Sequence, residues 1–425
     1  MLKDLLVDWY IGLRSLVKDA RWRGKVIPWL ARLHFFGHPS AQLKIVGVTG
    51  TNGKTTTTTL LYRIAIALGY RAGLIGTVEN IINGERLLTN FTTPGLPELH
   101  RLLNRMVREN CQYVFMEVSS HGIDQSRIAG LTFTGGIFTN LTHDHLDYHK
   151  NFENYFQAKK KFFKLLPRSA FALANADDSY GSRMLEGAKA QKYFYGFENT
   201  ADFIGQINRL DFNGLEIKIG QENIRSQLLG KFNAYNILAA WSACQLLGFD
   251  MEKVKKILED VQPPRGRFEH FTPSLGVLVV VDYAHSPDAL EKIILAVKEV
   301  KGKEGRLITV FGCGGDRDPL KRPKMGKIGA SMSDVAIFTS DNPRSEDPEK
   351  ILEDMTTGLT QDELKKVQTI TNRREAIVEA VKMAQKGDIL LCAGKGHETY
   401  QDIKGVKSHF DDMEELQRAF GARTP

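Results

Sequence analysis

The glycine-rich run at residues 47–56, GVTGTNGKTT, has the composition of a loop that binds the phosphates of a nucleotide. Its glycines would let backbone N–H groups approach phosphate oxygens closely, and a following helix would add favourable partial charge. Lys54 adds a full positive charge, and the Thr55 hydroxyl is a suitable magnesium ligand. The spacing is shorter than in the common phosphate loop, because only two residues separate Gly50 from Gly53. The predicted nucleotide-binding residues are Gly50, Thr51, Asn52, Gly53, Lys54, Thr55 and Thr56.

A second set of polar residues follows two predicted strands. Glu117 lies in the run EVSSHG, where its carboxylate would provide another magnesium ligand beside Thr55. Residues 143–149 hold three histidines and two aspartates. By itself this cluster is compatible with a zinc site, a solvated turn, or a magnesium and phosphate site. The glycine loop favours the third interpretation, because magnesium usually keeps waters and takes few protein ligands.

Apolar runs predict the elements that must position these residues. A short buried strand at residues 43–46 precedes the loop, and residues 60–68 have helical apolar spacing. Short alternating segments at residues 193–229 predict an antiparallel excursion, and residues 230–247 read as a helix. Further buried strands are predicted at residues 113–118, 135–140, 170–175, 277–281, 306–311, 335–339 and 389–393. This alternation indicates an α/β fold with parallel sheets, whose ligands bind at the carboxyl ends of the strands.

Length and composition set the frame for these elements. A chain of 425 residues is too long for one core, so we expect two or three domains, with the clearest linker at residues 262–266. Hydrophobic content of 42% and charged content of 25% are typical of globular proteins. The net charge of +7 is mild and is explained by an anionic small substrate as well as by a nucleic acid. We expect the small substrate and no nucleic-acid partner.

Cysteine usage and the first 36 residues bear on location. The four cysteines are far apart and form no CxxC pair, which argues against a zinc site or a disulfide framework and is typical of a reducing cytoplasm. The chain has no apolar run of the roughly 18 residues that a spanning helix needs. Residues 1–36 mix aromatic and basic side chains and hold three of the four tryptophans. This segment either packs on the next domain or contacts a partner or the inner face of a membrane.

Seven motifs together resemble the Mur ligase family. They are GTNGKTTT, EVSSHG, TNLTHDHLDYH, the Tyr155-x-x-Ala158-Lys159 run, FNAYN, DYAHSPDAL and FGCGGDRD-x-x-KRP. The match runs in order from about residue 40 to residue 425. The resemblance implies a P-loop-type ATPase domain at residues 41–263 and a Rossmann-like α/β domain at residues 264–425. Residues 1–40 would form only a basic aromatic segment and a connector, too short for the family's usual N-terminal UDP-binding domain.

The resemblance also implies a mechanism. In this family ATP phosphorylates a substrate carboxylate, and an amine then displaces phosphate from the acyl phosphate to form an amide. Lys54 and Thr55 would hold the β- and γ-phosphates and one Mg²⁺, and Glu117 and His145 would bind Mg²⁺. The lysine triplet at residues 159–161 would by itself be a solvated basic face, but the resemblance singles out Lys159 as a carbamylated metal ligand. The other two lysines are expected to be solvated.

Further residues match the family's substrate positions. Asn233 and Asn236 would lie near the adenine, with ordinary helix capping as the alternative. In the C-terminal domain, Asp282 and His285 would contact the nucleotide, and Arg267 matches an interdomain arginine or is a plain linker charge. The residues expected to bind a muramoyl-dipeptide are Thr92, Thr93, Ser120 (or Ser119 in a shifted register), Gln125 and Arg127.

The run Asp341, Asn342, Pro343, Arg344 matches the motif of family members that use meso-diaminopimelate. A planar guanidinium can hold the distal carboxylate of this diamino acid through two hydrogen bonds. Arg317, Gly394 and Glu398 complete the matching pocket, and Glu398 would pair with the distal ammonium.

The resemblance therefore predicts a monomeric cytoplasmic ligase of peptidoglycan synthesis, with ATP and Mg²⁺ as cosubstrate and cofactor. It would add meso-diaminopimelate to UDP-MurNAc-L-Ala-D-Glu or a related muramoyl-dipeptide. Two alternatives stay open: a ligase like the folylpolyglutamate synthetases, and a catalytically silent nucleotide-binding scaffold.

Overall fold

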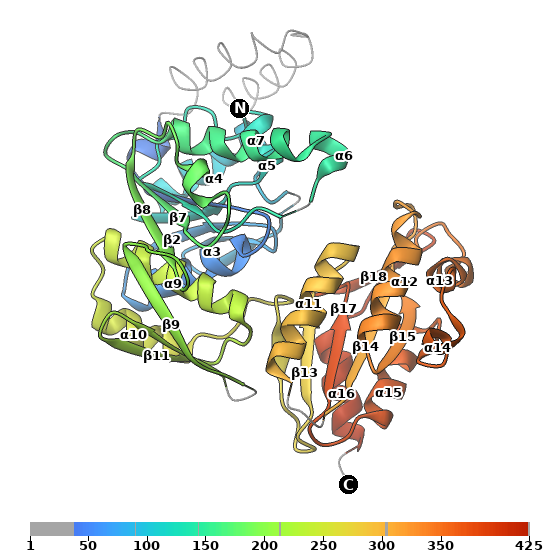
Figure 1. Ribbon diagram of the computed structural model, residues 1–425. Coiled ribbons are helices and arrows are strands. Elements are labelled where there is room, and N and C mark those ends of the chain that lie inside the picture. The colour runs from blue at the N-terminus through green and yellow to red at the C-terminus, as the bar shows by residue number, and fades with distance from the viewer. Residues whose placement is uncertain (1–37, 90, 143, 212–213, 302–304, 424–425) are drawn as a thin grey trace, which may run out of the picture. The chain divides into compact units, whose positions relative to one another are not determined.

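The computed structural model describes residues 38–89, 91–142, 144–211, 214–301 and 305–423 (Figure 1). The predicted segment at residues 1–36 and His143 lie outside the described residues. The described residues form two compact units, of which the first is residues 38–207, 217–225 and 233–261. The second is residues 208–216, 226–232 and 262–425. The predicted three-part division of the chain stays a prediction.

Within the described residues, the larger sheet has eleven strands in the order β11-β10-β9-β8-β7-β6-β1-β5-β2-β3-β4. Their bounds are β1 Lys44–Thr49, β2 Ala72–Ile75, β3 Asn80–Ile82, β4 Glu85–Leu87, β5 Tyr113–Glu117, β6 Gly135–Phe138, β7 Phe171–Asn175, β8 Gln191–Gly196, β9 Phe203–Asp211, β10 Gly214–Ile219 and β11 Glu222–Ser226. The central strands β6, β1, β5 and β2 pair in parallel. Their carboxyl ends therefore lie along one edge, where β1 meets the glycine loop.

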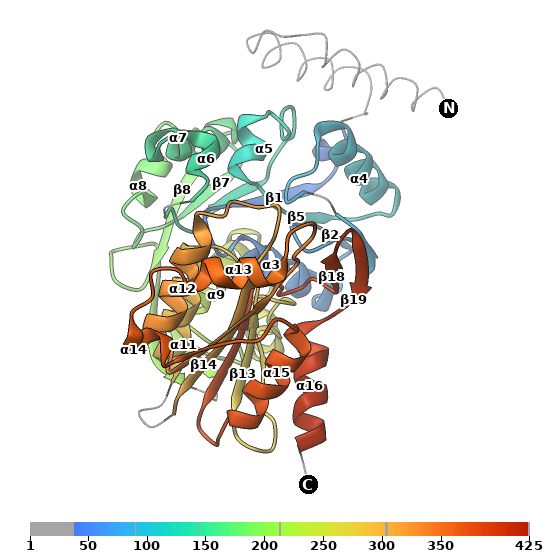
Figure 2. The same ribbon diagram turned by 90° about the vertical axis from the view of Figure 1, so that its right-hand side faces the viewer.

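Helices cover both faces of this central region. Helix α3 packs on β2 and β5. A hydrophobic core cluster joins strand residues of the sheet to apolar residues of α4, α5 and α7. Figure 2 shows α5, α6 and α7 grouped together. The helix bounds are α3 Lys54–Ala67, α4 Leu96–Arg108, α5 Ser120–Asp124, α6 Leu146–His149, α7 Phe152–Leu165, α8 Gly181–Met184, α9 Lys231–Leu246 and α10 Met251–Asp260, with a 3-10 turn at Pro39–Ala41.

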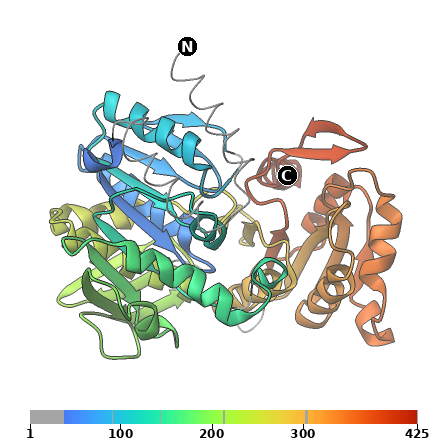
Figure 3. The same cartoon turned by 90° about the horizontal axis from the view of Figure 1, so that it is seen from above.

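The second unit contains a six-stranded sheet in the order β12-β13-β17-β14-β15-β16, as far as its residues are described. Alternate strand residues form two cores, one with α11, α12 and α13 and the other with α15 and α16. A hairpin of β18 and β19 is a separate two-stranded sheet, seen in red in Figure 3. The bounds are β12 Glu269–Phe271, β13 Leu278–Asp282, α11 Pro287–Val300, β14 Leu307–Cys313, α12 Lys321–Met332, β15 Val335–Ser340, α13 Pro348–Thr356, α14 Gln361–Leu364, β16 Val367–Thr369, α15 Arg373–Met383, β17 Ile389–Ala393, β18 Tyr400–Ile403, β19 Val406–His409 and α16 Asp412–Arg423.

The predicted α/β class with parallel sheets is confirmed, and the predicted buried strands agree with the observed ones to within a few residues. The antiparallel excursion predicted from residue 193 is wrong at its start. Strand β8 pairs in parallel with β7 and with the beginning of β9, because it continues the central sheet. None of the helices that the structure describes has the length and apolar character needed to cross a bilayer.

Candidate functional site

The glycine loop runs from the end of β1 to the start of α3 at Lys54. Its backbone is bound to the segment after β6, since the Thr51 amide donates to the Asn140 carbonyl at 2.8 Å and the Asn52 amide to Asn140 Oδ1 at 2.9 Å. The first-turn amides of α3 have no acceptor within the helix, and the helix dipole favours negative charge there. The loop is therefore fixed in place with donors available to phosphate oxygens.

Close packing also requires the two loop glycines. A Cβ on Gly50 would lie 1.9 Å from Thr139 Oγ1, and one on Gly53 would lie 2.4 Å from Asn236 Oδ1. Gly53 caps α3 with a φ of 85°, in the left-handed region that glycine tolerates. Phosphate approach was the reason for expecting glycines here, and contact with Thr139 and Asn236 adds a second reason.

Two lysines converge on the loop. Lys54 Nζ donates to the Gly50 and Thr51 carbonyls at 2.9 and 2.8 Å. Lys159 Nζ, on α7, donates to the same Gly50 carbonyl at 2.8 Å and lies 4.6 Å from the Tyr155 ring centroid. Burial, and then the nearby Lys54, lower the pKa of Lys159 well below its ordinary value. Burial beside a neutral acceptor therefore favours the uncharged amine at Lys159.

The structure separates the lysine triplet. Lys161 is exposed, with an ion pair to Asp124, as expected for a solvated side chain. The expectation that Lys160 is solvated is wrong, because its side chain is 10% exposed and pairs with Glu186 at 2.9 Å.

Glu117 is buried at the end of β5 and is held by a residue that sequence reasoning missed. Its carboxylate accepts from the Thr77 amide and hydroxyl, both at 2.9 Å. The Thr77 hydroxyl also lies 3.0 Å from Thr92 Oγ1, one of the residues predicted to bind the acceptor. The short run that precedes Thr77, residues 72–75, is apolar, and this was the only sequence signal for a strand end there.

His145 lies beside a group of aromatic rings. Its ring centroid is 4.9 Å from that of His121 and 6.0 Å from that of Tyr155, and Tyr155 OH lies 3.0 Å from Thr51 Oγ1 of the glycine loop. Partial burial and the cations Lys54 and Lys159 lower the pKa of His145, although Asp144 opposes this. A lower pKa favours the neutral imidazole that metal binding requires.

The predicted acceptor residues lie together. Arg127 donates to the Thr93 carbonyl at 2.7 Å and, through Nε and Nη2, to Gln125 Oε1 at 3.0 and 2.7 Å. Ser119 caps α5 and contacts Thr93 Oγ1 at 3.1 Å, while buried Ser120 contacts His149 Nε2 at 3.0 Å. Both serines therefore adjoin the group, and the structure does not choose one register of the motif.

Tyr148, which sequence reasoning also missed, connects this group to the histidines. Its hydroxyl donates to Asp124 Oδ2 at 3.1 Å and accepts from Gln125 Nε2 at 3.3 Å. Its ring centroid is 4.2 Å from that of His121, which in turn contacts His145. The tyrosine is part of the TNLTHDHLDYH motif, so the sequence indicated that it lies near the site. Its hydrogen-bond partners were not predictable from the sequence.

The two asparagines of α9 face the amino end of α3. Asn236 Nδ2 donates to Asn233 Oδ1 at 3.0 Å, and Asn236 Oδ1 accepts from Thr57 Oγ1 at 3.4 Å. Both side chains are buried. These contacts are side chain to side chain rather than helix capping. A role near the adenine stays a prediction.

In the second unit, Asp282 ends β13 and accepts from the Phe268 and Ala284 amides at 2.8 and 2.9 Å. Burial raises the pKa of Asp282, although these donors and Arg267 oppose the shift. The Arg267 guanidinium lies 5.0 Å from the Tyr283 ring centroid. His285 Nδ1 contacts the Tyr283 carbonyl at 2.8 Å. A nucleotide contact for Asp282 and His285 stays a prediction.

The residues predicted to bind the amino acid surround a lysine that sequence reasoning left without a role. Lys395 is fully buried, and its Nζ lies 3.3 Å from Asn342 Oδ1, 3.3 Å from Glu398 Oε2 and 3.6 Å from Asp341 Oδ1. Glu398 Oε2 also accepts from Asn342 Nδ2 at 2.9 Å. Glu398 would therefore share its carboxylate between Lys395 and any substrate ammonium.

Arg344 and Arg317 both lie close to Gly314. A Cβ on Gly314 would be 3.0 Å from Arg344 Nη1 and 3.7 Å from Arg317 Cγ. Arg344 has a φ of 51°, and its amide and carbonyl bond to Asp402 and Lys404 of the β18–β19 hairpin. The main-chain pairing holds this left-handed conformation. Gly394, with a φ of 114°, follows β17 and donates its amide to the Asp282 carbonyl at 3.0 Å.

The donor set of the first unit fits a hard cation. Thr55 and Glu117 offer oxygen atoms, which magnesium prefers, and His145 adds an imidazole. Among the described residues, no group of three or more His, Cys, Asp or Glu side chains could hold a metal ion. A magnesium site of few protein ligands around bound phosphates is compatible with this finding.

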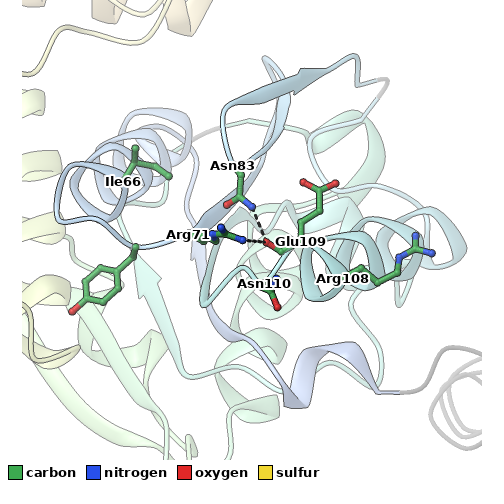
Figure 4. Close-up of a pocket in the computed structure, with 7 residues that line it drawn as sticks. Ile66, Arg71, Asn83, Arg108, Glu109 and Asn110 are labelled. Carbon is green, nitrogen blue, oxygen red and sulfur yellow. Dashed lines mark hydrogen bonds between the residues drawn. The ribbon is translucent and has the colours of Figure 1, made fainter.

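A surface cavity of about 550 Å³ lies elsewhere on the first unit (Figure 4). It is lined by Ile66, Tyr70, Arg71, Asn83, Arg108, Glu109 and Asn110. Arg71 and Asn83 both donate to the Glu109 carbonyl, as the figure shows. None of these residues was predicted to bind substrate.

Two family models match the chain. Residues 48–244 match a family model described as the Mur ligase middle domain. Residues 266–396 match one described as the Mur ligase, glutamate ligase domain.

Curated relatives are named UDP-N-acetylmuramoyl-L-alanyl-D-glutamate--2,6-diaminopimelate ligase. The relative from Parabacteroides distasonis is 51% identical over 389 residues, which cover 92% of this chain and 80% of the relative. The relative from Clostridium botulinum is 44% identical over 390 residues, covering 90% and 79%. A solved structure of a ligase with this name has a TM-score of 0.68 and 35% identity, covering 95% of this chain and 83% of that one. Folylpolyglutamate synthase from Thermotoga maritima, at 16% identity and a TM-score of 0.67, shares the fold; the match covers 91% and 93%.

Proposed function

Because the chain belongs to the Mur ligase family, we propose that it is an ATP-dependent ligase that adds meso-diaminopimelate to the D-glutamate carboxylate of UDP-MurNAc-L-Ala-D-Glu or a related muramoyl-dipeptide. The glycine loop carries the chemical part of this proposal, with Lys54 at its Gly50 and Thr51 carbonyls and the buried Lys159 amine beside it. Phosphoryl transfer depends mainly on positioning and on neutralising charge, and this loop supplies both. The proposed reaction would be a step of peptidoglycan synthesis.

The first unit would carry out activation. The α3 amides and Lys54 hold the β- and γ-phosphates of ATP, and the γ-phosphoryl group is transferred to the acceptor carboxylate with release of ADP. Thr93, Gln125 and Arg127, with Ser119 or Ser120 and Thr92, hold the muramoyl-dipeptide so that its carboxylate is presented to the phosphoryl group.

Thr55, Glu117, His145 and Lys159 would hold Mg²⁺, with Lys159 as a carbamate. Bound there, the ion would neutralise phosphate charge. The lowered pKa of Lys159 favours the free amine, which adds CO₂ and loses a proton to give an anionic oxygen donor. Thr77 fixes the Glu117 carboxylate.

The second unit would select the amine. Arg344, with Arg317, binds the distal carboxylate of meso-diaminopimelate through paired hydrogen bonds. Glu398 binds the distal ammonium, and Asp341 and Asn342 fix Lys395 beside it. The other amine attacks the acyl carbonyl, and collapse of the tetrahedral intermediate releases phosphate and leaves the amide.

Phosphate release tests the proposal. The full chain is incubated with Mg²⁺, ATP and UDP-MurNAc-L-Ala-D-Glu, together with meso-diaminopimelate, with L-lysine or without an amino acid. Steady release with meso-diaminopimelate alone is the expected result, with the tripeptide product detected by mass. Phosphate release that does not depend on the acceptor or on the amino acid would contradict a ligase activity. Turnover with a folate substrate and glutamate would favour the alternative suggested by the shared fold.

A further inference from the structure

Two loops of the second unit carry the arginines that face Gly314. The first follows β14 and contains Gly315, Asp316 and Arg317. The second follows β15 and contains Arg344. An arginine can distinguish a carboxylate by two parallel hydrogen bonds only if its plane is held in the right orientation. The contacts that hold these loops therefore bear on substrate selection.

The loops are joined directly at several points. Arg344 Nη1 donates to the Gly315 carbonyl at 2.6 Å, and the Gly315 amide donates to the Asn342 carbonyl at 2.9 Å. Ser345 Oγ donates to Asp316 Oδ1 at 2.6 Å. A Cβ on Gly315 would lie 2.0 Å from the Pro343 carbonyl oxygen, so the two backbones are in close contact.

Glu346 adds a charged link from these loops to the core of the unit. Its Oε1 accepts from the Asp316 amide at 2.5 Å, and both of its oxygens accept from Arg322 Nη2 at 2.8 Å. Arg322, on α12, has a side chain that is 3% exposed. The Glu346 amide also donates to the Pro343 carbonyl at 3.0 Å, which closes the turn around Arg344.

Asp354 provides an internal comparison. It accepts from Arg322 Nη1 at 2.9 Å, so it pairs with the same guanidinium as Glu346. It lies on α13, and its Arg322 contact is on the helix side rather than at the Asp316 loop. Two carboxylates therefore neutralise one buried arginine, and Glu346 alone of the two also binds the Asp316 amide.

We propose that Glu346 is a positioning residue for the amino-acid substrate: by joining buried Arg322 to the Asp316 amide, it fixes the two loops that carry Arg317 and Arg344. This inference rests on the proposed function, because it takes the distal carboxylate of the amino acid as the ligand of those arginines. Glu346 itself does not touch the substrate in this role. Its effect is on the orientation of the guanidinium groups.

The test compares Glu346→Ala, Glu346→Gln and Asp354→Ala in the full chain. We measure kcat, the KM values for meso-diaminopimelate and ATP, and the melting temperature of each variant. For Glu346→Ala we expect a rise of roughly 10- to 100-fold in the KM for meso-diaminopimelate, because small displacements of binding groups are costly. The KM for ATP should change less than about twofold, since the ATP-binding loop keeps its contacts.

The other two variants separate positioning from general stability. Glu346→Gln keeps an oxygen for the Asp316 amide but loses the charge that faces Arg322, so its KM for meso-diaminopimelate should lie between those of wild type and Glu346→Ala. Asp354→Ala removes a partner of Arg322 without touching the loop, and its KM for the amino acid should stay within about twofold of wild type.

Three results would overturn the role of Glu346 while leaving the proposed function intact. The first is an unchanged KM for meso-diaminopimelate in Glu346→Ala. The second is an equal rise of this KM in Asp354→Ala, and the third is a rise in all KM values together; either would indicate only a loss of stability. A wild-type chain that does not turn over meso-diaminopimelate at all would instead overturn the proposed function, and this inference with it.

Discussion

The two candidate sites treat buried charge in opposite ways. In the first unit, the buried Lys159 Nζ donates to the Gly50 carbonyl of the glycine loop, which is a neutral acceptor. In the second unit, Lys395 lies among Asp341, Asn342 and Glu398, so its charge is already balanced by carboxylates. Burial beside a neutral acceptor favours the uncharged amine at Lys159, whereas a balanced buried charge presets geometry. The first arrangement suits a phosphate-bearing ligand, and the second suits a zwitterionic amino acid.

The strongest test of this comparison is Lys159→Met. We expect turnover to fall by about 10³-fold, since the variant removes a group placed at the transferring phosphoryl. The melting temperature should stay the same or rise, because the substitution replaces a desolvated amine by an apolar side chain. Phosphate release and thermal unfolding measure the two effects. Lys161→Met is the control, because that side chain is exposed and should affect neither quantity. A destabilised Lys159→Met would mean that the first site is balanced after all.

Removing one member of a balanced, buried ion pair in the second unit should instead lower stability. Arg373 is fully buried and bonds to Asp412 through two contacts of 2.7 Å. Arg373→Met should lower the free energy of unfolding by about 4 kcal/mol, because Asp412 would be left buried and unpaired. Urea unfolding measures the change. Lys365→Met, which breaks an exposed pair with Asp362, should change it by less than about 0.5 kcal/mol. A small effect at Arg373 would show that water or relaxation compensates for the loss.

Arg344→Lys sharpens the comparison by keeping the charge and removing the planar fork. We expect kcat/KM for meso-diaminopimelate to fall by about 100-fold, since a lysine cannot make two parallel hydrogen bonds to a carboxylate. The KM for ATP should be unchanged. Steady-state kinetics with each substrate varied in turn would show this. If Arg344→Lys has wild-type kinetics, the positive charge at this position matters more for binding meso-diaminopimelate than the planar guanidinium.

Tyr148→Phe is the smallest of these changes and tests the contact between the acceptor residues and the histidines. Loss of the hydroxyl removes its bonds to Asp124 and Gln125 but keeps the ring beside His121. We expect the KM for the muramoyl-dipeptide to rise by about 3- to 10-fold, the loss of one or two hydrogen bonds. Tyr193→Phe, whose hydroxyl bonds only locally to Gln191 in β8, is the matched control. Equal kinetics for the two variants would contradict a role for Tyr148 in acceptor binding.

Much of the fold was predictable because its signals are local. Apolar runs indicated the central strands, and the glycine loop followed by helical spacing indicated β1 and α3. The β18–β19 hairpin was not predicted, because its residues are polar or exposed. Among the described residues, its strands pair only with each other and with Arg344. The parallel direction of β8 was also missed, since strand direction is set by the crossover and not by the pattern of alternation.

For the candidate sites, residue types indicated the chemistry but not the supporting contacts. Glu117 and Arg344 were singled out by motif. Thr77, which holds the first, and Glu346, which joins the loops around the second, were not. Each supporting contact joins segments that are distant in the chain or follow from a turn, so no spacing rule predicts it.

The lysine triplet shows the boundary between the two kinds of information. By itself the sequence determined that three cations stand in a row on a helix near a phosphate loop, and resemblance to relatives pointed to Lys159. The tertiary structure decided what each one contacts: Lys159 the Gly50 carbonyl, Lys160 Glu186 and Lys161 Asp124. Successive helical residues point about 100° apart, so three identical side chains meet three different surroundings once α7 is packed in place.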